Sequence, residues 1–173
     1  METALIIAVP EAEALVGRFR DRHDPSDTAG CPAHVTLLYP FKPPHDIDAD
    51  VLAGLRRCLA GLAPFPFSLV GMRRFPGVLY LAPEPAEPFR QLTLALWERH
   101  PETPPYGGRH PNIVPHLSVA QLADEMRLDQ VAEQFARASD GHLPVTATAE
   151  AVTLIERTAE RWQVRDMLRL GSG

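Results

Sequence analysis

The sequence is poor in cysteine and has no long apolar run. Its 173 residues include two cysteines, Cys31 and Cys58, which are too few for the disulfide framework of a small secreted domain. The residues after Met1 lack the charged segment and long apolar stretch of a secretory signal, so a cytoplasmic location is expected. The apolar runs are strand-length, well short of the roughly 18 residues that a membrane span requires, so no membrane association is expected.

An excess of positive charge is also missing. The formal net charge is −5, whereas a protein that follows a nucleic-acid backbone usually carries a basic stripe. The charge therefore argues against a long nucleic-acid duplex as a partner. No glycine-rich fingerprint joins a strand to a helix, which disfavours a dinucleotide-binding sheet. Proline, in contrast, is abundant, and its 18 residues cluster between the expected elements.

Hydrophobic periodicity predicts an α+β protein. The expected strands cover residues 3–9, 33–39, 65–75, 78–82, 113–121, 143–156 and 161–170. The expected helices cover residues 12–19, 48–62 and 86–99, and a fourth follows Asp124. Asp48 and Asp124 are the expected N-caps of the second and fourth helices. About seven strands and four helices without strict βαβ alternation fit two similar sheet-and-helix halves in one domain, 1–173.

Two segments carry the same pair of polar side chains. Residues 32–37 (PAHVTL) place His34 two positions before Thr36, and residues 115–119 (PHLSV) place His116 two positions before Ser118. In a strand, residues i and i+2 stand on the same face about 7 Å apart. Each segment therefore presents an imidazole beside a hydroxyl, one segment in each half of the chain. Two such strands facing each other would surround a phosphate.

The four side chains suit phosphodiester cleavage. One imidazole of a pair can take a proton as general base while the other, protonated, gives one as general acid. The hydroxyls of Thr36 and Ser118 are donors for the charge that grows on the non-bridging oxygens. We call His34, Thr36, His116 and Ser118 the phosphate cradle. This chemistry predicts a bell-shaped pH profile near neutrality, and the residues alone leave open which histidine is acid and which is base.

The segments 34–41 (HVTLLYPF) and 116–119 (HLSV) resemble the paired signatures of the two-histidine phosphoesterase superfamily, in its 2′-5′ RNA ligase and cyclic phosphodiesterase branch. The resemblance implies a bilobal, pseudo-symmetric fold in which two antiparallel sheets flanked by helices enclose a central cleft. It places catalysis on His34 and His116 and phosphate binding on Thr36 and Ser118, with no metal or other cofactor.

The activity that the resemblance implies is hydrolysis of a 2′,3′-cyclic phosphate or a 2′-5′ linkage, with ligation as the reverse reaction. The expected partner is a small nucleotide or an RNA terminus, and we expect a monomer. A non-catalytic module that binds a nucleotide or phosphate in the same fold is the main alternative. The intact pair of motifs favours catalysis.

Three further residues are candidate substrate contacts. Tyr39 would either stack on a base or pack in the core. Arg73 lies an even number of positions from Phe67, Leu69 and Phe75, so in a regular strand it would share their apolar face. It would then be either a member of a buried ion pair or a phosphate contact in the cleft. Arg109, in a Gly-rich loop before the second motif, would reach a substrate or, as we favour, remain a solvated loop charge.

A zinc enzyme is the remaining competitor. Cys31 lies three residues before His34 and could form half of a zinc site. Structural zinc usually needs four ligands, often in two close pairs, and no second pair of Cys or His at ligand spacing lies near His116. We therefore interpret Cys31 as a small buried side chain. A last alternative, in which both histidines are buried structural residues, is disfavoured by the hydroxyl that accompanies each.

Overall fold

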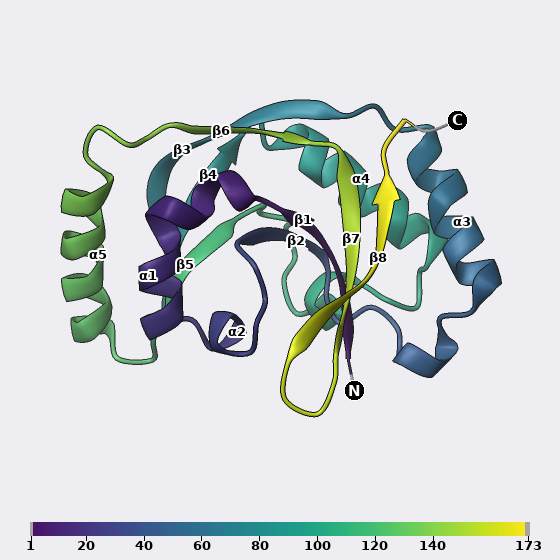
Figure 1. Cartoon of the computed structure of the whole chain (residues 1–173), viewed down its shortest axis with the longest axis horizontal. Coiled ribbons are helices and arrows are strands. Elements are labelled where there is room, and N and C mark those ends of the chain that lie inside the picture. Colours follow the sequence, from purple (N-terminus) through teal and green to yellow (C-terminus); the bar gives the residue numbers. More distant parts are fainter. Residues whose placement is uncertain (1, 172–173) are drawn as a thin grey trace.

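Two four-stranded antiparallel sheets form the frame of the molecule (Figure 1). The computed structural model describes residues 2–171. The first sheet has the strand order β2(His34–Leu38), β1(Thr3–Ala8), β7(Ala151–Arg157), β8(Trp162–Arg169). The second has the order β5(Leu117–Gln121), β4(Val78–Glu84), β3(Phe65–Phe75), β6(Val145–Ala149). The strand that carries each motif is thus an edge strand of its own sheet.

Five α-helices and three short 3-10 turns connect the strands within residues 2–171. The helices are α1(Glu13–His23), α2(Pro25–Thr28), α3(Ala49–Ala60), α4(Glu87–Arg99) and α5(Glu125–Ser139). The 3-10 turns are η1(Pro10–Ala12), η2(Pro44–Asp46) and η3(Pro105–Gly108). The expected caps are confirmed, because Asp48 accepts a bond from the Val51 amide and Asp124 accepts bonds from the amides of Met126 and Arg127.

The helices tie the two halves together. Helix α1, which follows a strand of the first sheet, packs against β5 of the second, and α4, which follows a strand of the second sheet, packs against β2 of the first. Strands β2 and β5 also contact each other. One hydrophobic core contains residues of both sheets, including Val35 and Leu37 of β2 and Leu117 and Val119 of β5. This packing brings the two motif strands together.

The expected α+β architecture is confirmed, with two corrections of detail. The run 143–156 is not one strand, because it divides at Glu150 into β6, which pairs with β3, and β7, which pairs with β1. Residues 2–171 therefore hold eight strands where about seven were expected. The strand expected over 113–121 begins only at Leu117, and the Ile113 carbonyl accepts a bond from Arg90 Nε. No helix among residues 2–171 has the length and apolar character to cross a bilayer.

Candidate active site

Both motifs have the same pattern of burial. In each, half-buried polar residues alternate with buried apolar ones, so His34 and Thr36 share one face of β2, and His116 and Ser118 share one face at the start of β5. The buried neighbours are Ala33, Val35, Leu37, Pro115, Leu117 and Val119. The apolar faces hold the segments in the core, and the polar faces are left partly open to solvent.

The two imidazoles are oriented by the same hydrogen bond. His34 Nδ1 lies 2.7 Å from the carbonyl oxygen of Pro32, and His116 Nδ1 lies 2.8 Å from that of Val114. A carbonyl only accepts, so Nδ1 carries the hydrogen in each neutral ring and Nε2 keeps its lone pair. Nε2 is therefore the atom of each histidine that is available for proton exchange with a bound group.

The environment favours neutral imidazoles in the free protein. Burial lowers the pKa of His34 to about 4; the bond to Pro32 and the charge of Asp24 oppose this, and the charges of Arg20 and His116 add to it. Burial also lowers the pKa of His116, against the opposing bond to Val114 and with a smaller contribution from His110. The electrostatic effect of His116 on His34 agrees with the contact between their strands.

Tyr106 connects the two motifs, and the sequence interpretation missed it. Its ring is stacked on the His116 imidazole, with centroids 6.1 Å apart and planes inclined by 23°. Tyr106 also lines one hollow together with Thr36 of the other motif. The available signal was an aromatic residue directly before Gly107 and Gly108, in the loop that precedes the second motif.

An aromatic wall supports the other sides of His116. Phe75 and Tyr80 contact the imidazole edge-on at centroid distances of 5.2 and 5.5 Å, and they stack on each other at 4.3 Å. Tyr80 is the register partner of Ser118, so this wall and the second hydroxyl share a face of the sheet. The second histidine is therefore packed among aromatic rings.

The sequence model of the 2′-5′ RNA ligase superfamily matches residues 8–161. The chain belongs to this superfamily. Among solved structures, TT0787 of Thermus thermophilus is similar with a TM-score of 0.66 and 20% identity, covering 99% of this chain and 98% of that one. Escherichia coli LigT complexed with 3′-AMP is similar with a TM-score of 0.59 and 16% identity, covering 98% and 97%. No protein of curated function matches the sequence.

These similarities confirm the expected fold and the family resemblance. The chain has the bilobal α+β architecture of LigT-like proteins, with two antiparallel sheets and helices around them. It is a member of an enzyme superfamily of phosphoesterases and RNA ligases. At these identities the structural neighbours establish the fold alone, so the roles of individual residues rest on the geometry of this chain.

Arg73 lies on a different face from the one that parity predicted. A β-bulge between Leu69 and Gly71 shifts the register of β3, so Arg73 pairs with Tyr80 and stands on the face of Ser118. Its side chain is 62% exposed, and its Nη2 lies 3.8 Å from Glu84. The interpretation of Arg73 as a buried ion-pair member is therefore wrong, because the bulge reverses the alternation on which it depended.

The other two candidate contacts are engaged in local interactions. The Tyr39 hydroxyl donates to Glu2 at 3.0 Å, and its half-buried ring meets Trp162 edge-on. Arg109 is exposed and its Nε donates to the carbonyl of Tyr106 at 3.1 Å. Tyr39 thus packs against the first sheet, and Arg109 stabilises the loop that carries Tyr106.

Cys31 is buried, as interpreted from the sequence. Its Sγ lies 3.4 Å from His34 Nδ1, and burial raises the pKa of the thiol to about 12, so it remains protonated. Among residues 2–171 no group of three or more His, Cys, Asp or Glu side chains is arranged to hold a metal ion.

A buried arginine supports the segment before the first motif. Arg20 of α1 is 1% exposed, and its Nε donates to Asp24 at 3.2 Å. Its Nη2 donates to the carbonyl of Cys31 at 3.1 Å and to Ser26 Oγ at 3.3 Å. The carbonyl that orients His34 belongs to the next residue, Pro32. Arg20 therefore fixes the backbone on which the orientation of His34 depends.

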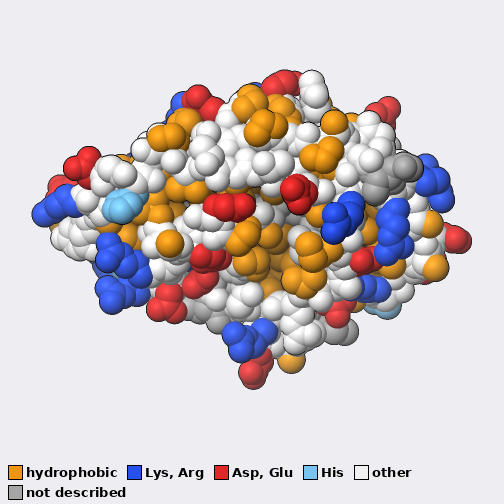
Figure 2. Space-filling model, turned by 45° about the horizontal axis from the view of Figure 1, so that its top comes forward, with side chains coloured by type: hydrophobic (Ala, Val, Ile, Leu, Met, Phe, Trp, Pro, Cys, Tyr) orange, Lys and Arg blue, Asp and Glu red, His pale blue; other side chains and the backbone are white. Residues whose placement is uncertain are grey.

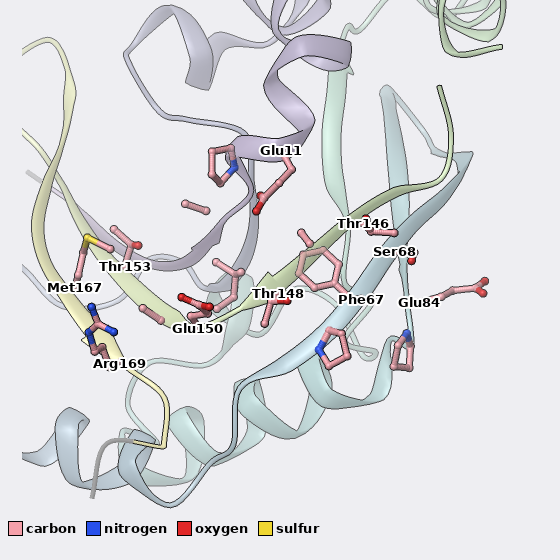
Figure 3. Close-up of a pocket in the computed structure, with 17 residues that line it drawn as sticks. Glu11, Phe67, Ser68, Glu84, Thr146, Thr148, Glu150, Thr153, Met167 and Arg169 are labelled. Carbon is pink, nitrogen blue, oxygen red and sulfur yellow. The ribbon is translucent and has the colours of Figure 1, made fainter. Parts of the chain in front are cut away.

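A cleft of about 1010 Å³ lies between the two sheets. Figure 3 shows Glu11, Glu84 and Glu150 around it, and Figure 2 shows a face where acidic side chains lie beside exposed hydrophobic ones. Among the described residues, its lining includes Ala8, the register partner of His34, and none of the four cradle residues. Arg169 also lines the cleft, so its lining carries charges of both signs.

Proposed function

We propose that this superfamily member is a metal-independent phosphodiesterase that acts on 2′,3′-cyclic phosphates or 2′-5′ linkages of RNA ends or small nucleotides. His34 and His116 are its general acid–base pair, Thr36 and Ser118 hold the phosphate, and ligation is the reverse reaction. The observation that carries the proposal is the matched bond of each Nδ1 to the carbonyl two residues earlier, which leaves both Nε2 atoms free.

Hydrolysis of a cyclic phosphate needs two proton transfers. One neutral imidazole takes a proton from a water molecule through Nε2 as the water oxygen bonds to phosphorus. The other histidine, protonated, gives its Nε2 proton to the ribose oxygen as the phosphorus–oxygen bond breaks. The products are a phosphate monoester and a free hydroxyl. The hydroxyls of Thr36 and Ser118 donate to the non-bridging oxygens as negative charge grows there.

Because burial lowers the pKa of both histidines, we expect the pH range in which the free enzyme is active to lie below neutrality. One histidine must be protonated and the other neutral, and both are neutral at pH 7 in the free protein. A bound phosphate anion raises the pKa of the imidazoles beside it, which supplies the acid in the complex. The profile of kcat/KM, which reports the free enzyme, is therefore expected to be centred below the neutral range that the sequence suggested.

The test is a panel of 2′,3′-cyclic nucleotides and a 2′-5′-linked dinucleotide, assayed without added metal and with a strong chelator. We expect turnover in the wild type and a loss of about 100- to 10,000-fold in His34→Ala and in His116→Ala. His142→Ala, which removes an exposed histidine outside the cradle, is the matched control. Full activity in either cradle variant contradicts the proposal, and nucleotide binding without any turnover would instead identify a binding module.

A further inference from the structure

Glu13 reaches the segment before His34 from the start of α1. Its carboxylate oxygen Oε1 accepts a hydrogen bond of 2.5 Å from the amide of Ala33. This amide belongs to the same peptide group as the carbonyl of Pro32, which accepts the bond of 2.7 Å from His34 Nδ1. One planar peptide group therefore binds a carboxylate through its N–H and the imidazole through its carbonyl oxygen.

The carboxylate restrains the carbonyl that orients His34. The N–H and the carbonyl of a peptide group lie in one plane, so a partner that holds the N–H also sets the direction of the carbonyl. A hydrogen bond to a charged acceptor is roughly twice as strong as a neutral one. Hydrogen bonds that follow one another through polar groups also strengthen each other. The bond from Ala33 to Glu13 therefore supports the bond from His34 to Pro32.

The second motif cannot form the same contact. His116 Nδ1 bonds to the carbonyl of Val114 at 2.8 Å, and the nitrogen of that peptide group belongs to Pro115, which has no N–H. A carboxylate cannot bind this peptide group in the way that Glu13 binds the first. The chain thus orients one imidazole through a peptide group that an acidic side chain holds, and the other through a peptide group that lacks the donor.

The contact with Ala33 is distinct from the ion pairs of Arg20. Glu13 Oε1 lies 4.0 Å from Arg20 Nη1, and Asp27 Oδ1 lies closer to the same nitrogen, at 3.7 Å. The bond from the Ala33 amide to Glu13 is much shorter than either distance. Asp27 therefore offers a comparison, because its removal changes the charge beside Arg20 and leaves the bond between Glu13 and Ala33 in place.

We propose that Glu13 is a positioning residue for His34, which acts through the peptide group between Pro32 and Ala33. The proposal rests on the proposed function, since it takes His34 as one of the two catalytic histidines. Glu13 keeps the Pro32 carbonyl bonded to Nδ1, so that Nε2 keeps the lone pair that the proton transfer needs. Without this restraint the ring can turn, or can carry its hydrogen on Nε2, and either change disturbs the transfer.

The test combines nitrogen NMR of the histidine rings with turnover of a 2′,3′-cyclic nucleotide, both on the full chain. The ring nitrogen shifts at neutral pH report which nitrogen carries the hydrogen, and in the wild type we expect Nδ1–H in His34 and in His116. In Glu13→Ala the shifts of His34 should move away from the Nδ1–H form while those of His116 stay. Its kcat should fall about 10- to 100-fold, the range seen when a group that orients a metal-bound histidine is removed, with KM within about twofold of the wild type.

Three further variants separate this role from others. Glu13→Gln keeps an oxygen acceptor for the Ala33 amide, so its kcat should fall about fivefold or less, the difference between a charged and a neutral acceptor. Glu13→Asp keeps the charge at the start of α1 on a shorter side chain and should behave as Glu13→Ala, so it decides the question if Glu13→Ala does not fold. Asp27→Ala removes the other carboxylate beside Arg20 and should match the wild type.

A His34 ring that keeps the Nδ1–H form in Glu13→Ala and in Glu13→Asp overturns the proposal, and so does a wild-type kcat in these variants. An equal loss of kcat in Asp27→Ala overturns it as well, because the effect would then act through Arg20. A wild type that turns over none of the substrates contradicts the proposed function instead. In that case the nitrogen shifts of His34 still test the role of Glu13 by themselves.

Discussion

The two histidine segments are alike in local geometry and different in what surrounds them. Each imidazole is bonded to the carbonyl two residues before it. Behind the first, buried Arg20 binds Asp24 and the carbonyl of Cys31 and holds the preceding backbone in place. Before the second runs an exposed Pro- and Gly-rich loop with a positive φ at Tyr106 and the two glycines after it.

The difference shows that a short sequence can orient a side chain while residues outside it provide the support. The residues around each histidine repeat the same strand geometry, and this repetition produces the same hydrogen bond twice. The support behind each segment comes from residues that are not part of the motif. The half that contains His34 is therefore held by buried polar contacts, whereas an exposed loop precedes His116.

The largest expected effect concerns the buried contacts of Arg20 behind His34. Arg20→Gln should lower the free energy of unfolding by about 3–5 kcal/mol, because the buried Asp24 carboxylate loses its charged partner and keeps only the bonds from Ser26. Arg22→Gln, an exposed position on the same helix, should change it by less than about 0.5 kcal/mol. Urea unfolding measures both. Equal stability of the two variants would show that the first motif has no such support.

A smaller effect concerns the two hydroxyls. Ser118→Ala should weaken 3′-AMP binding about 10- to 100-fold, as expected for a lost hydrogen bond to a charged group. Thr36→Val should weaken it by a similar factor, because Thr36 holds the matching position in the first motif. Calorimetric titrations of the two variants measure both losses. Binding at the wild-type level in both variants would contradict the role of the two hydroxyls.

The smallest effect is the dependence of stability on pH. The pKa of His34 is lowered by folding, so the unfolded chain binds a proton that the folded protein excludes as the pH falls from about 6.5 towards 4. Stability is therefore full above about pH 6.5 and decreases through this window. His34→Gln should flatten the decrease, as measured by urea unfolding at several pH values. An unchanged slope in the variant would assign the effect to other groups.

The sequence predicted the elements whose signals are local. The alternation of apolar residues around His34 and His116 identified the two polar faces, and capping residues marked two helix starts correctly. It missed the division of the run 143–156, because Ala149 and Ala151 continue a strand pattern on both sides of Glu150 and nothing local shows that the two parts pair in different sheets.

Residues whose role depends on distant partners could not be placed in this way. The bulge in β3 moved Arg73 to the face of Ser118, and one extra residue in a strand is enough to reverse every side chain beyond it. Tyr106 gave only the weak signal of an aromatic before two glycines, since its neighbours Thr36 and His116 belong to segments at the edges of two separate sheets.

The sequence by itself determined which side chains share a face: an imidazole and a hydroxyl two residues apart in a strand must stand together, whatever the rest of the molecule does. Only the tertiary structure decided that β2 and β5 meet, that burial lowers the pKa of both histidines, and that Tyr106 lies between the motifs. The physical reason is the distance along the chain over which each effect acts. Strand alternation is fixed by neighbouring residues, whereas desolvation and ring contacts arise from groups that the chain brings together only when its two halves pack.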